Sequence, residues 1–194
     1  MMTISRLLSI IVFSLMFYGC AAPYKPVPEG YTGSIAYVED TYSHKQTSTA
    51  HFYELAMVNG RHIESSWGAT RSRNYGRGRE FDPVMVKRRL PAEPLEVTIQ
   101  AYQFFSTDFE SMIGDNYLLQ HTFNFTPKAN EEYRVKGDVL WLRTSVWLED
   151  SNGEKVEGSF LSLEAIDRKE KLKTDKEKRR KEKKEKKLKQ NSSI

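Results

Sequence analysis

The sequence predicts an all-β protein whose main part is a single antiparallel β-sandwich of about seven or eight strands. Between residue 31 and about residue 160, apolar and polar residues alternate with a period of two, as they do in strands with one buried face. Turn-forming dipeptides, Asn59-Gly60 and Asn152-Gly153, separate these segments at short spacing. The same region has no amphipathic helical pattern of a dozen residues. A small closed barrel is the alternative architecture.

The alternation is clearest in Leu95–Tyr102, where every second residue is apolar and would face one side of a strand. Other segments rich in β-branched and aromatic residues are also expected to form strands. These segments are Ser34–Glu39, Ala50–Val58, Val84–Leu90, His121–Phe125, Glu131–Val139 and Ser145–Glu149. This number of short strands favours a sandwich of the immunoglobulin-like or transthyretin-like style.

Residues 1–19 have the composition of a secretory signal peptide. Arg6 precedes an uncharged, mostly apolar run, Leu7–Tyr18, and small residues surround Cys20 at its end. The run is short for a permanent transmembrane helix, which needs about 20 apolar residues. In these features the chain resembles a bacterial lipoprotein, in which the cysteine receives the lipid and becomes the mature N-terminus. By that resemblance, Ala21 after the cysteine implies the outer membrane. An ordinary secretory signal and an uncleaved anchor are the alternatives.

Two unusual segments flank the predicted domain, which is expected over residues 31–163. Residues 20–30 contain three prolines and are expected to form an extended tether behind the lipid. Residues 164–194 form a lysine-rich tail, in whose basic part only Leu172 and Leu188 are apolar. The tail has no apolar face to bury, so it is expected to be either a solvated single helix or a disordered polycation.

The charges are distributed unevenly along the chain. The whole sequence has 30 Lys and Arg against 26 Asp and Glu, a formal net charge of +4. Residues 61–89 hold eight basic and three acidic side chains, whereas residues 90–166 hold five basic and thirteen acidic ones. Residues 168–190 hold fourteen basic and five acidic side chains. Such segregation indicates interaction surfaces or tails.

The first basic region contains the candidate anion-binding residues. Glycines next to arginines permit a tight loop, and guanidinium groups suit two-point binding of phosphate or carboxylate. The candidates are Arg71, Arg73, Tyr75, Arg77, Arg79, Lys87, Arg88 and Arg89. An exported protein would meet lipopolysaccharide phosphates, phospholipid head groups or peptidoglycan carboxylates, and little nucleic acid. The alternative is that these side chains form ion pairs with the acidic stretch 90–166.

No pattern in the sequence indicates catalysis. The four histidines, His44, His51, His62 and His121, lie far apart and have no metal-binding spacing. His51 and His121 fall in expected strands, which favours a structural role for both. Cys20 is assigned to the lipid, and neither a nucleophile elbow nor a phosphate-binding loop is present. The sequence therefore predicts a non-catalytic protein without a metal ion or cofactor. A hydrolase would need a cluster of histidines or carboxylates that only the fold could assemble.

Three residues near the end of the predicted domain invite a functional interpretation. Glu149 and Asp150 are adjacent carboxylates, but neighbours on a strand face opposite sides, so they suit an acid–base pair poorly. Asp150 is expected to cap the following turn, and Trp147 is expected to pack in the core or against a neighbouring strand.

Four segments together carry a resemblance to a known group of proteins. Asn74–Gly78, Phe125–Pro127, Tyr133–Gly137 and Ser145–Asp150 resemble segments of small lipoproteins from Gram-negative bacteria that have no assigned activity. The likeness covers most of residues 31–158. It implies a β-sandwich at the cell envelope and carries over no site residue.

These observations predict a non-catalytic cell-envelope lipoprotein, a binding or assembly module that faces the periplasm and is anchored through Cys20. The basic loop and tail would contact anionic polymers such as peptidoglycan or lipopolysaccharide, and an envelope protein is a further expected partner. No nucleic-acid partner is expected. One alternative is a carrier that holds a small hydrophobic or glycan ligand between the sheets. Another is an accessory subunit of a secretion or surface machine.

Overall fold

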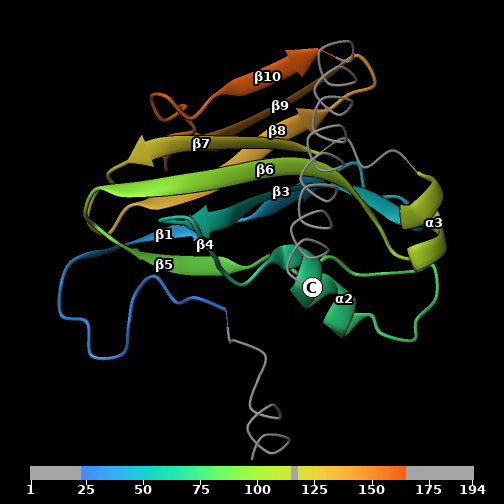
Figure 1. Ribbon diagram of the computed structural model, residues 1–194, viewed down its shortest axis with the longest axis horizontal. Helices are drawn as coiled ribbons and strands as arrows, with labels where there is room; N and C mark the ends of the chain where they lie inside the picture. The colour runs from blue at the N-terminus through green and yellow to red at the C-terminus, as the bar shows by residue number, and fades with distance from the viewer. Residues whose placement is uncertain (1–22, 115–117, 165–194) are drawn as a thin grey trace, which may run out of the picture.

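The computed structural model describes residues 23–114 and 118–164, which form two β-sheets packed face to face (Figure 1). The elements in chain order are β1 (Ile35–Glu39), β2 (Thr41–Ser43), β3 (Thr49–Val58), β4 (Arg61–His62), α2 (Ser66–Arg73), β5 (Lys87–Pro91), β6 (Leu95–Phe105), α3 (Asp108–Ile113), β7 (Leu119–Phe125), β8 (Glu132–Val139), β9 (Arg143–Glu149) and β10 (Leu161–Glu164). One sheet has the order β10-β9-β8-β1-β5, and the other has the order β2-β3-β6-β7 with β4 paired to β3. The predicted all-β class is confirmed, with two separate sheets in place of a closed barrel.

The expectation of a wholly antiparallel arrangement is wrong at one pair of strands. β1 runs parallel to β8, with Tyr37 opposite Glu132, while its other neighbour, β5, is antiparallel to it. A parallel pair needs a long crossover between its strands. Here the whole second sheet lies between β1 and β8 in the chain and supplies that crossover.

Most predicted strands coincide with observed ones, but one begins later than expected and three were not predicted. Val84–Leu90 forms a strand only from Lys87, because the N–H of Val86 is hydrogen-bonded to the hydroxyl of Ser66 in α2. The unpredicted strands β2, β4 and β10 are only two to four residues long. Segments this short show no measurable alternation of their own and are defined by pairing with a longer neighbour.

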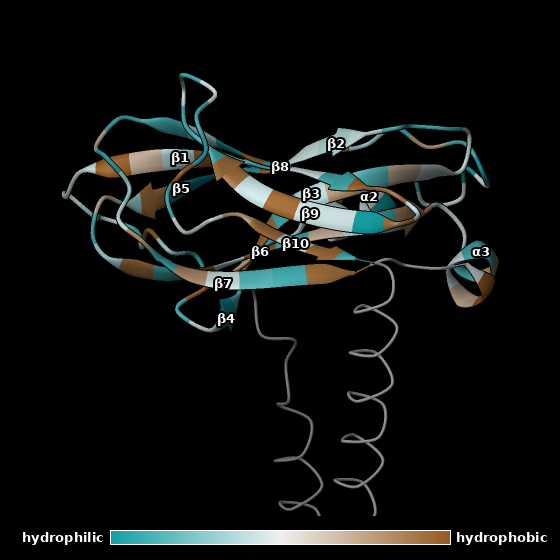
Figure 2. Cartoon of the chain, turned by 90° about the horizontal axis from the view of Figure 1, so that it is seen from above, coloured by the Kyte–Doolittle hydropathy of each residue, from teal (hydrophilic) through white to brown (hydrophobic). Residues whose placement is uncertain are grey.

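The main hydrophobic core lies between the two sheets. Leu95, Val97, Ile99 and Ala101, predicted to share one face of a strand, all lie in this core and are at most 4% exposed. Residues of β1, β8 and β9 close the core from the opposite sheet. Hydrophobic residues recur along the strands of both layers (Figure 2). The apolar residues of the period-two pattern are therefore the ones buried between the sheets, as expected for strands.

The outer face of the sheet that contains β3 and β6 is also covered. Phe52 of β3 and Phe104 of β6 stack there with ring centroids 4.7 Å apart. Phe81, from the connection between α2 and β5, packs against Phe104 at 4.9 Å. These rings form a second hydrophobic cluster, so β3 and β6 are buried on both faces. Because of this third layer, polar residues on the outer face of β3 and β6 can be buried as well.

Two short helices, which the sequence did not suggest, are begun by local capping. Ser65 precedes α2 and accepts a hydrogen bond from the N–H of Gly68 through its side chain. Thr107 plays the same part before α3, accepting from the N–H of Glu110. Such caps satisfy backbone donors that a helix start leaves free. The helices have eight and six residues, too few for the amphipathic pattern that was sought. α3 lies at one end of the stacked sheets (Figure 2).

Both predicted turns reverse the chain. Asn59 and Gly60 adopt positive φ angles of 52° and 70° and join β3 to β4, which confirms the hairpin. The second turn follows Asp150, whose carboxylate accepts hydrogen bonds from the N–H groups of Asn152 and Glu154, both at 2.9 Å. Asp150 thus caps its turn as predicted, and these backbone bonds lower the pKa of its carboxyl group.

The first described residues are attached to the domain. Tyr24 forms a parallel bridge with Ile63 beside β4, and its N–H donates to the carbonyl of His62 at 3.2 Å. Val27 is buried as well. Cys20, the predicted signal peptide and the tail beyond Glu164 lie outside the described residues. Within residues 23–114 and 118–164, no helix has the length and apolar character needed to cross a bilayer.

Candidate functional site

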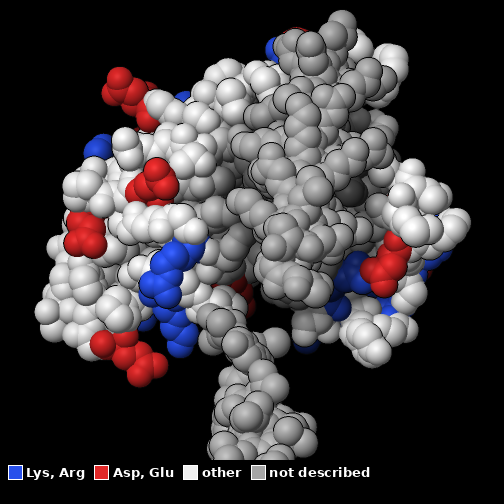
Figure 3. Space-filling model, viewed as in Figure 1, with Lys and Arg blue, Asp and Glu red and all other residues white. Residues whose placement is uncertain are grey.

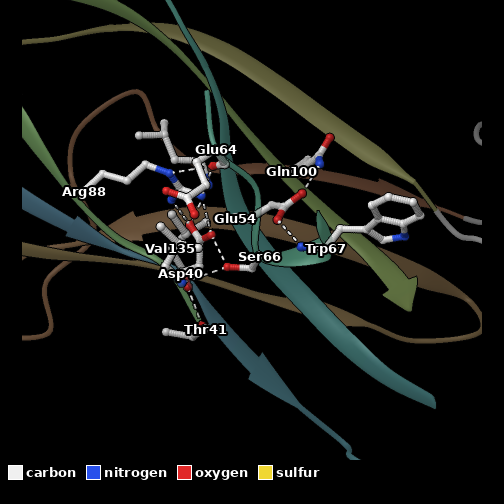
Figure 4. A network of polar contacts seen from close by, with 11 residues as sticks. Asp40, Thr41, Glu54, Glu64, Ser66, Trp67, Arg88, Gln100 and Val135 are labelled. Carbon is white, nitrogen blue, oxygen red and sulfur yellow. Dashed lines mark hydrogen bonds and ion pairs between the residues drawn. The ribbon is translucent and has the colours of Figure 1, made fainter. Parts of the chain in front are cut away.

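A buried ion pair lies where the chain passes from one sheet to the other. Asp40 separates β1 from β2, and Arg88 reaches it from β5 (Figure 4). The Nη1 and Nη2 atoms of Arg88 lie 2.6 and 2.8 Å from the two carboxylate oxygens. The side chains are 6% and 0% exposed. Two-point pairing of this kind compensates charges that have been removed from water.

Backbone and hydroxyl groups complete the surroundings of this pair. Asp40 also accepts hydrogen bonds from the hydroxyl of Ser66 and from the N–H of Leu55, the latter at 2.9 Å. Arg88 donates through Nε and Nη2 to the carbonyl of Glu64. Burial raises the pKa of the Asp40 carboxyl, and Arg88 and the other donors oppose that rise. The pair joins β1, β3, β5 and α2, and its hydrogen-bonding groups are already used.

A second buried carboxyl group, that of Glu54, lies in β3 and is 1% exposed. One of its oxygens accepts from the side-chain amide of Gln100 at 2.5 Å, and the other from the N–H of Trp67 at 3.3 Å (Figure 4). Burial is the largest cause that raises its pKa, followed by the charge of Asp40. The β3–β6 register shifts next to it, between Leu55 and Met57. Such irregularities occur often beside binding sites.

Glu54 lies at the floor of a groove of about 480 Å³ on the outer face of β3 and β6. That volume is within the range of about 300–1,000 Å³ typical of small-molecule sites. Two glutamines, two serines and the exposed His62 also line it. The other buried lining residues are Ala56, Ile63 and Tyr102, and the exposed Trp67 and Leu118 stand at the rim. The groove is therefore mostly apolar, with a few polar groups at defined positions.

Tyr102 supplies the most unusual of these polar groups. Its side chain is 8% exposed, and its hydroxyl is enclosed by the protein beside the carboxyl of Glu54, with which it interacts at a geometry poorer than that of an ordinary hydrogen bond. Burial raises its pKa well above the usual value, and the nearby carboxyl of Glu54 raises it further. The interaction with Glu54 compensates part of the desolvation of this hydroxyl.

Five of the eight predicted anion-binding residues form ion pairs within the chain. The pairs are Arg71–Asp108, Arg77–Asp82 at 2.7 Å, Arg79–Glu110 at 2.9 Å, Lys87–Glu132 at 2.6 Å and Arg88–Asp40. Three of the partners belong to the acidic region 90–166, as the alternative interpretation of the sequence expected. On the face shown in Figure 3, the visible basic side chains stand in small groups with acidic ones between them.

The eight residues do not meet on one surface. Arg88 is buried, whereas Lys87 and Arg89 are exposed on the other side of the same strand. Tyr75 follows α2 and is 94% exposed. Arg73 and Arg89 form no ion pair with any residue in the described ranges. Anion binding by the exposed members stays a prediction.

The fold brings two of the four histidines, His44 and His51, into contact. His51 of β3 lies with its ring 4.8 Å from that of His44, and burial followed by the charge of His44 lowers its pKa. Nε2 of His121 is 2.7 Å from the carbonyl of Gly158. Both strand histidines are partly exposed, as expected. No three His, Cys, Asp or Glu side chains in the described part of the chain are grouped to hold a metal ion.

Trp147 has a packing role at the edge of the domain. Its ring centroid is 6.2 Å from that of Phe160, and the ammonium of Lys155 lies 4.2 Å from the indole centroid. The indole N–H donates to the carboxylate of Glu149 at 2.7 Å. The side chain therefore packs across the turn after β9 and outside the two buried clusters.

The sequence contained a signal for the groove that composition and motifs did not show. In the predicted strand Ala50–Val58, Glu54 has the same parity as Ala50, Phe52 and Ala56. A carboxylate on an otherwise apolar strand face is costly to bury and needs partners. Its partner Gln100 lies on the adjacent strand, and no spacing rule connects the two in sequence.

Comparisons with protein-family models, with curated proteins and with solved structures found no match. The chemistry of the groove and of the chain ends therefore carries the functional proposal.

Proposed function

We propose that this chain is a lipid-anchored, non-catalytic binding module of the bacterial cell envelope, built as an immunoglobulin-like or transthyretin-like sandwich. It is exported, acylated at Cys20 and held at the outer membrane facing the periplasm. Its ligand binds in the groove over β3 and β6. The observation that carries the proposal is the preformed, mostly apolar groove with a few polar side chains in its lining.

The surroundings of the two buried carboxyl groups support binding over catalysis. A general acid or base must reach the reacting proton, directly or through one water. Asp40 is bound at both oxygens by Arg88, and Glu54 accepts hydrogen bonds at both of its oxygens. These two carboxyl groups are thus engaged in holding the fold.

The position of Tyr24 supports a close relation between the anchor and the groove. Tyr24 is bridged to Ile63, which lines the groove. Cys20 precedes Tyr24 by four residues, and four residues extend over at most about 14 Å. A lipid at Cys20 would hold the groove beside the membrane surface. The basic tail would add attraction to anionic lipopolysaccharide or peptidoglycan, and an envelope protein remains a proposed further partner.

Palmitate labelling in a Gram-negative host tests the anchor. The wild-type chain is expected to incorporate labelled palmitate and to fractionate with the outer membrane. Cys20→Ala is expected to lose the label and to leave the membrane fraction, because the thiol that carries the lipid is gone. Unlabelled wild type, or a Cys20→Ala variant that keeps the label, would overturn the anchor.

A further inference from the structure

The short helix α3 turns its apolar side chains away from the domain. Phe109, Met112 and Ile113 have the i, i+3, i+4 spacing that puts them on one face of a helix, and they are 66%, 77% and 66% exposed. The helix contacts the domain through a polar residue instead, because Glu110 accepts a hydrogen bond from the hydroxyl of Ser48 at 3.0 Å. A surface helix normally packs its apolar face against the core, so this arrangement indicates a partner other than water.

A second group of exposed apolar side chains lies in the turn between β8 and β9. The N–H of Leu140 donates to the carbonyl of Arg143 at 2.9 Å, so Trp141 and Leu142 occupy the two central positions of a tight turn. Their side chains are 77% and 62% exposed and lie outside the two buried clusters. Asn, Asp and Gly are the usual residues at such positions. Large apolar residues there add nothing to the core.

Both groups lie at the same end of the stacked sheets (Figure 2). Ser48, which donates to α3, directly precedes β3, and Gly137 near the end of β8 packs on the ring of Tyr53 in the first half of β3. Together they form an apolar end of the domain. It contains six of the eleven exposed large hydrophobic side chains among residues 23–114 and 118–164, namely Phe109, Met112, Ile113, Leu140, Trp141 and Leu142.

The charges beside the apolar end indicate an anionic lipid surface as its partner. Arg143 follows the turn and forms no ion pair with any residue in the described ranges. It lies opposite Glu164 in the pairing of β9 with β10. From Glu164 the chain continues into the tail, whose residues 168–190 hold fourteen basic and five acidic side chains. Basic groups next to exposed apolar ones match lipid phosphates above a hydrocarbon layer.

The shape of the apolar end also suits a bilayer. Five of its six side chains are at least 62% exposed, so they project from the surface on two separate elements. A protein partner would need a fitted pocket for each element, whereas lipids rearrange around whatever projects into them. Tryptophan is favoured at the boundary between head groups and hydrocarbon, where its ring is buried and its N–H stays near water.

We propose that the apolar end inserts into the head-group region of an anionic phospholipid bilayer. Trp141 lies at the boundary with the hydrocarbon, and Arg143 and the tail contact the lipid phosphates. This inference goes beyond the proposed anchor, because the contact requires no acylation of Cys20. In the lipidated protein it is a second point of attachment, which fixes the orientation of the domain on the membrane.

Vesicle flotation of the full mature chain with Cys20→Ala tests the inference, because this chain has no thiol to carry the lipid. The probe is a vesicle of phosphatidylethanolamine and phosphatidylglycerol that also contains phosphatidylcholine brominated in its acyl chains. The chain is expected to float with the vesicles, and bromine is expected to quench its tryptophan fluorescence. Trp141→Phe keeps an aromatic ring, so it should still bind but lose most of the quenching. A chain that stays in solution overturns the inference.

Matched serine variants locate the contact. Trp141→Ser and Phe109→Ser each remove one exposed apolar side chain, so the fold should be retained while partition into vesicles falls about tenfold. Phe160→Ser makes the same change on a half-exposed side chain at the other end of β10 from Glu164, and should bind as the parent chain does. Partition that the first two variants leave unchanged, or that all three reduce equally, overturns the site.

Salt separates insertion from adsorption of the tail alone. High salt screens the attraction of basic groups to phosphates, so less protein should float, but the bound fraction should still be quenched. Bound protein without quenching would overturn insertion in favour of the tail. Palmitate labelling of the chain with Cys20 intact is independent of this result. A chain that is labelled but never quenched keeps the anchor and loses the second contact.

Discussion

Arg88 in β5 and Arg79 after α2 belong to one basic region of the sequence but have opposite surroundings in the fold. The Arg88 side chain is 6% exposed and pairs with Asp40 at 2.6 Å, whereas Arg79 is 71% exposed and pairs with Glu110 at 2.9 Å. The two distances are similar, so they do not explain why the pairs differ in strength. The difference is burial, because water screens the Arg79 pair and is excluded from the Arg88 pair.

The same contrast exists between neighbouring residues of β5. Arg88 and Arg89 are chemically identical, but the strand turns the first inward and the second outward. Composition therefore indicates how many charges a region has and leaves open which of them hold the fold. Three tests of this difference follow, beginning with the largest expected effect.

Replacing Arg88 by methionine should be strongly destabilising. Arg88→Met keeps most of the side-chain volume but leaves the buried carboxyl of Asp40 without its cation. Breaking a buried pair in this way lowers the free energy of unfolding by about 3–5 kcal/mol. Urea unfolding followed by circular dichroism measures the change.

Arg89→Met is the matched control for this measurement. The side chain is exposed on the opposite side of the strand, so its substitution should change the free energy of unfolding by no more than about 0.5 kcal/mol. Equal losses from the two variants would show that burial does not distinguish them.

The second test uses the pH dependence of stability at Glu54. Its pKa in the folded protein is raised above 4.5, so between 4.5 and the folded pKa the native state binds more protons than the unfolded state. Stability therefore falls as pH rises through that window, by about 1.4 kcal/mol for each unit of upward shift. Glu54→Gln should flatten this part of the curve.

Urea unfolding at a series of pH values checks the slope. Asp40, whose pKa is also raised, contributes to the same window in both proteins, and Arg88 and Tyr102 are the other ionisable groups beside Glu54. The difference between the two curves consequently isolates Glu54. If the stability curves of wild type and Glu54→Gln ran parallel over this pH range, the Glu54 carboxyl would not be buried as described.

The smallest effect is expected at Arg79. Arg79→Ala removes an ion pair whose arginine is mostly exposed, so the free energy of unfolding should fall by less than about 1 kcal/mol. Half a molar salt should reduce the difference further, because surface charges are screened. Thermal unfolding at two salt concentrations measures both. A loss as large as that of Arg88→Met would remove the contrast between the two regions.

Much of the fold could be predicted from the sequence, and little of the candidate site. The strand Leu95–Tyr102 and the turn at Asn59-Gly60 were predictable because alternation and positive φ are local properties. The parallel pairing of β1 with β8 was not, since it depends on how the chain passes between the sheets. The groove was missed because its polar residues are spread over several elements and form no motif.

By itself the sequence determined the longer strands, the turns and the charge segregation, because each depends on side chains and backbone within a few residues. The tertiary structure alone decided which charges are buried and which are screened. Arg88 and Asp40 are 48 positions apart, and Glu54 and Gln100 are 46 apart. The free energy of a polar group depends on its neighbours and on its distance from water. For these residues the neighbours and the distance from water are set only when the two sheets and α2 have packed together.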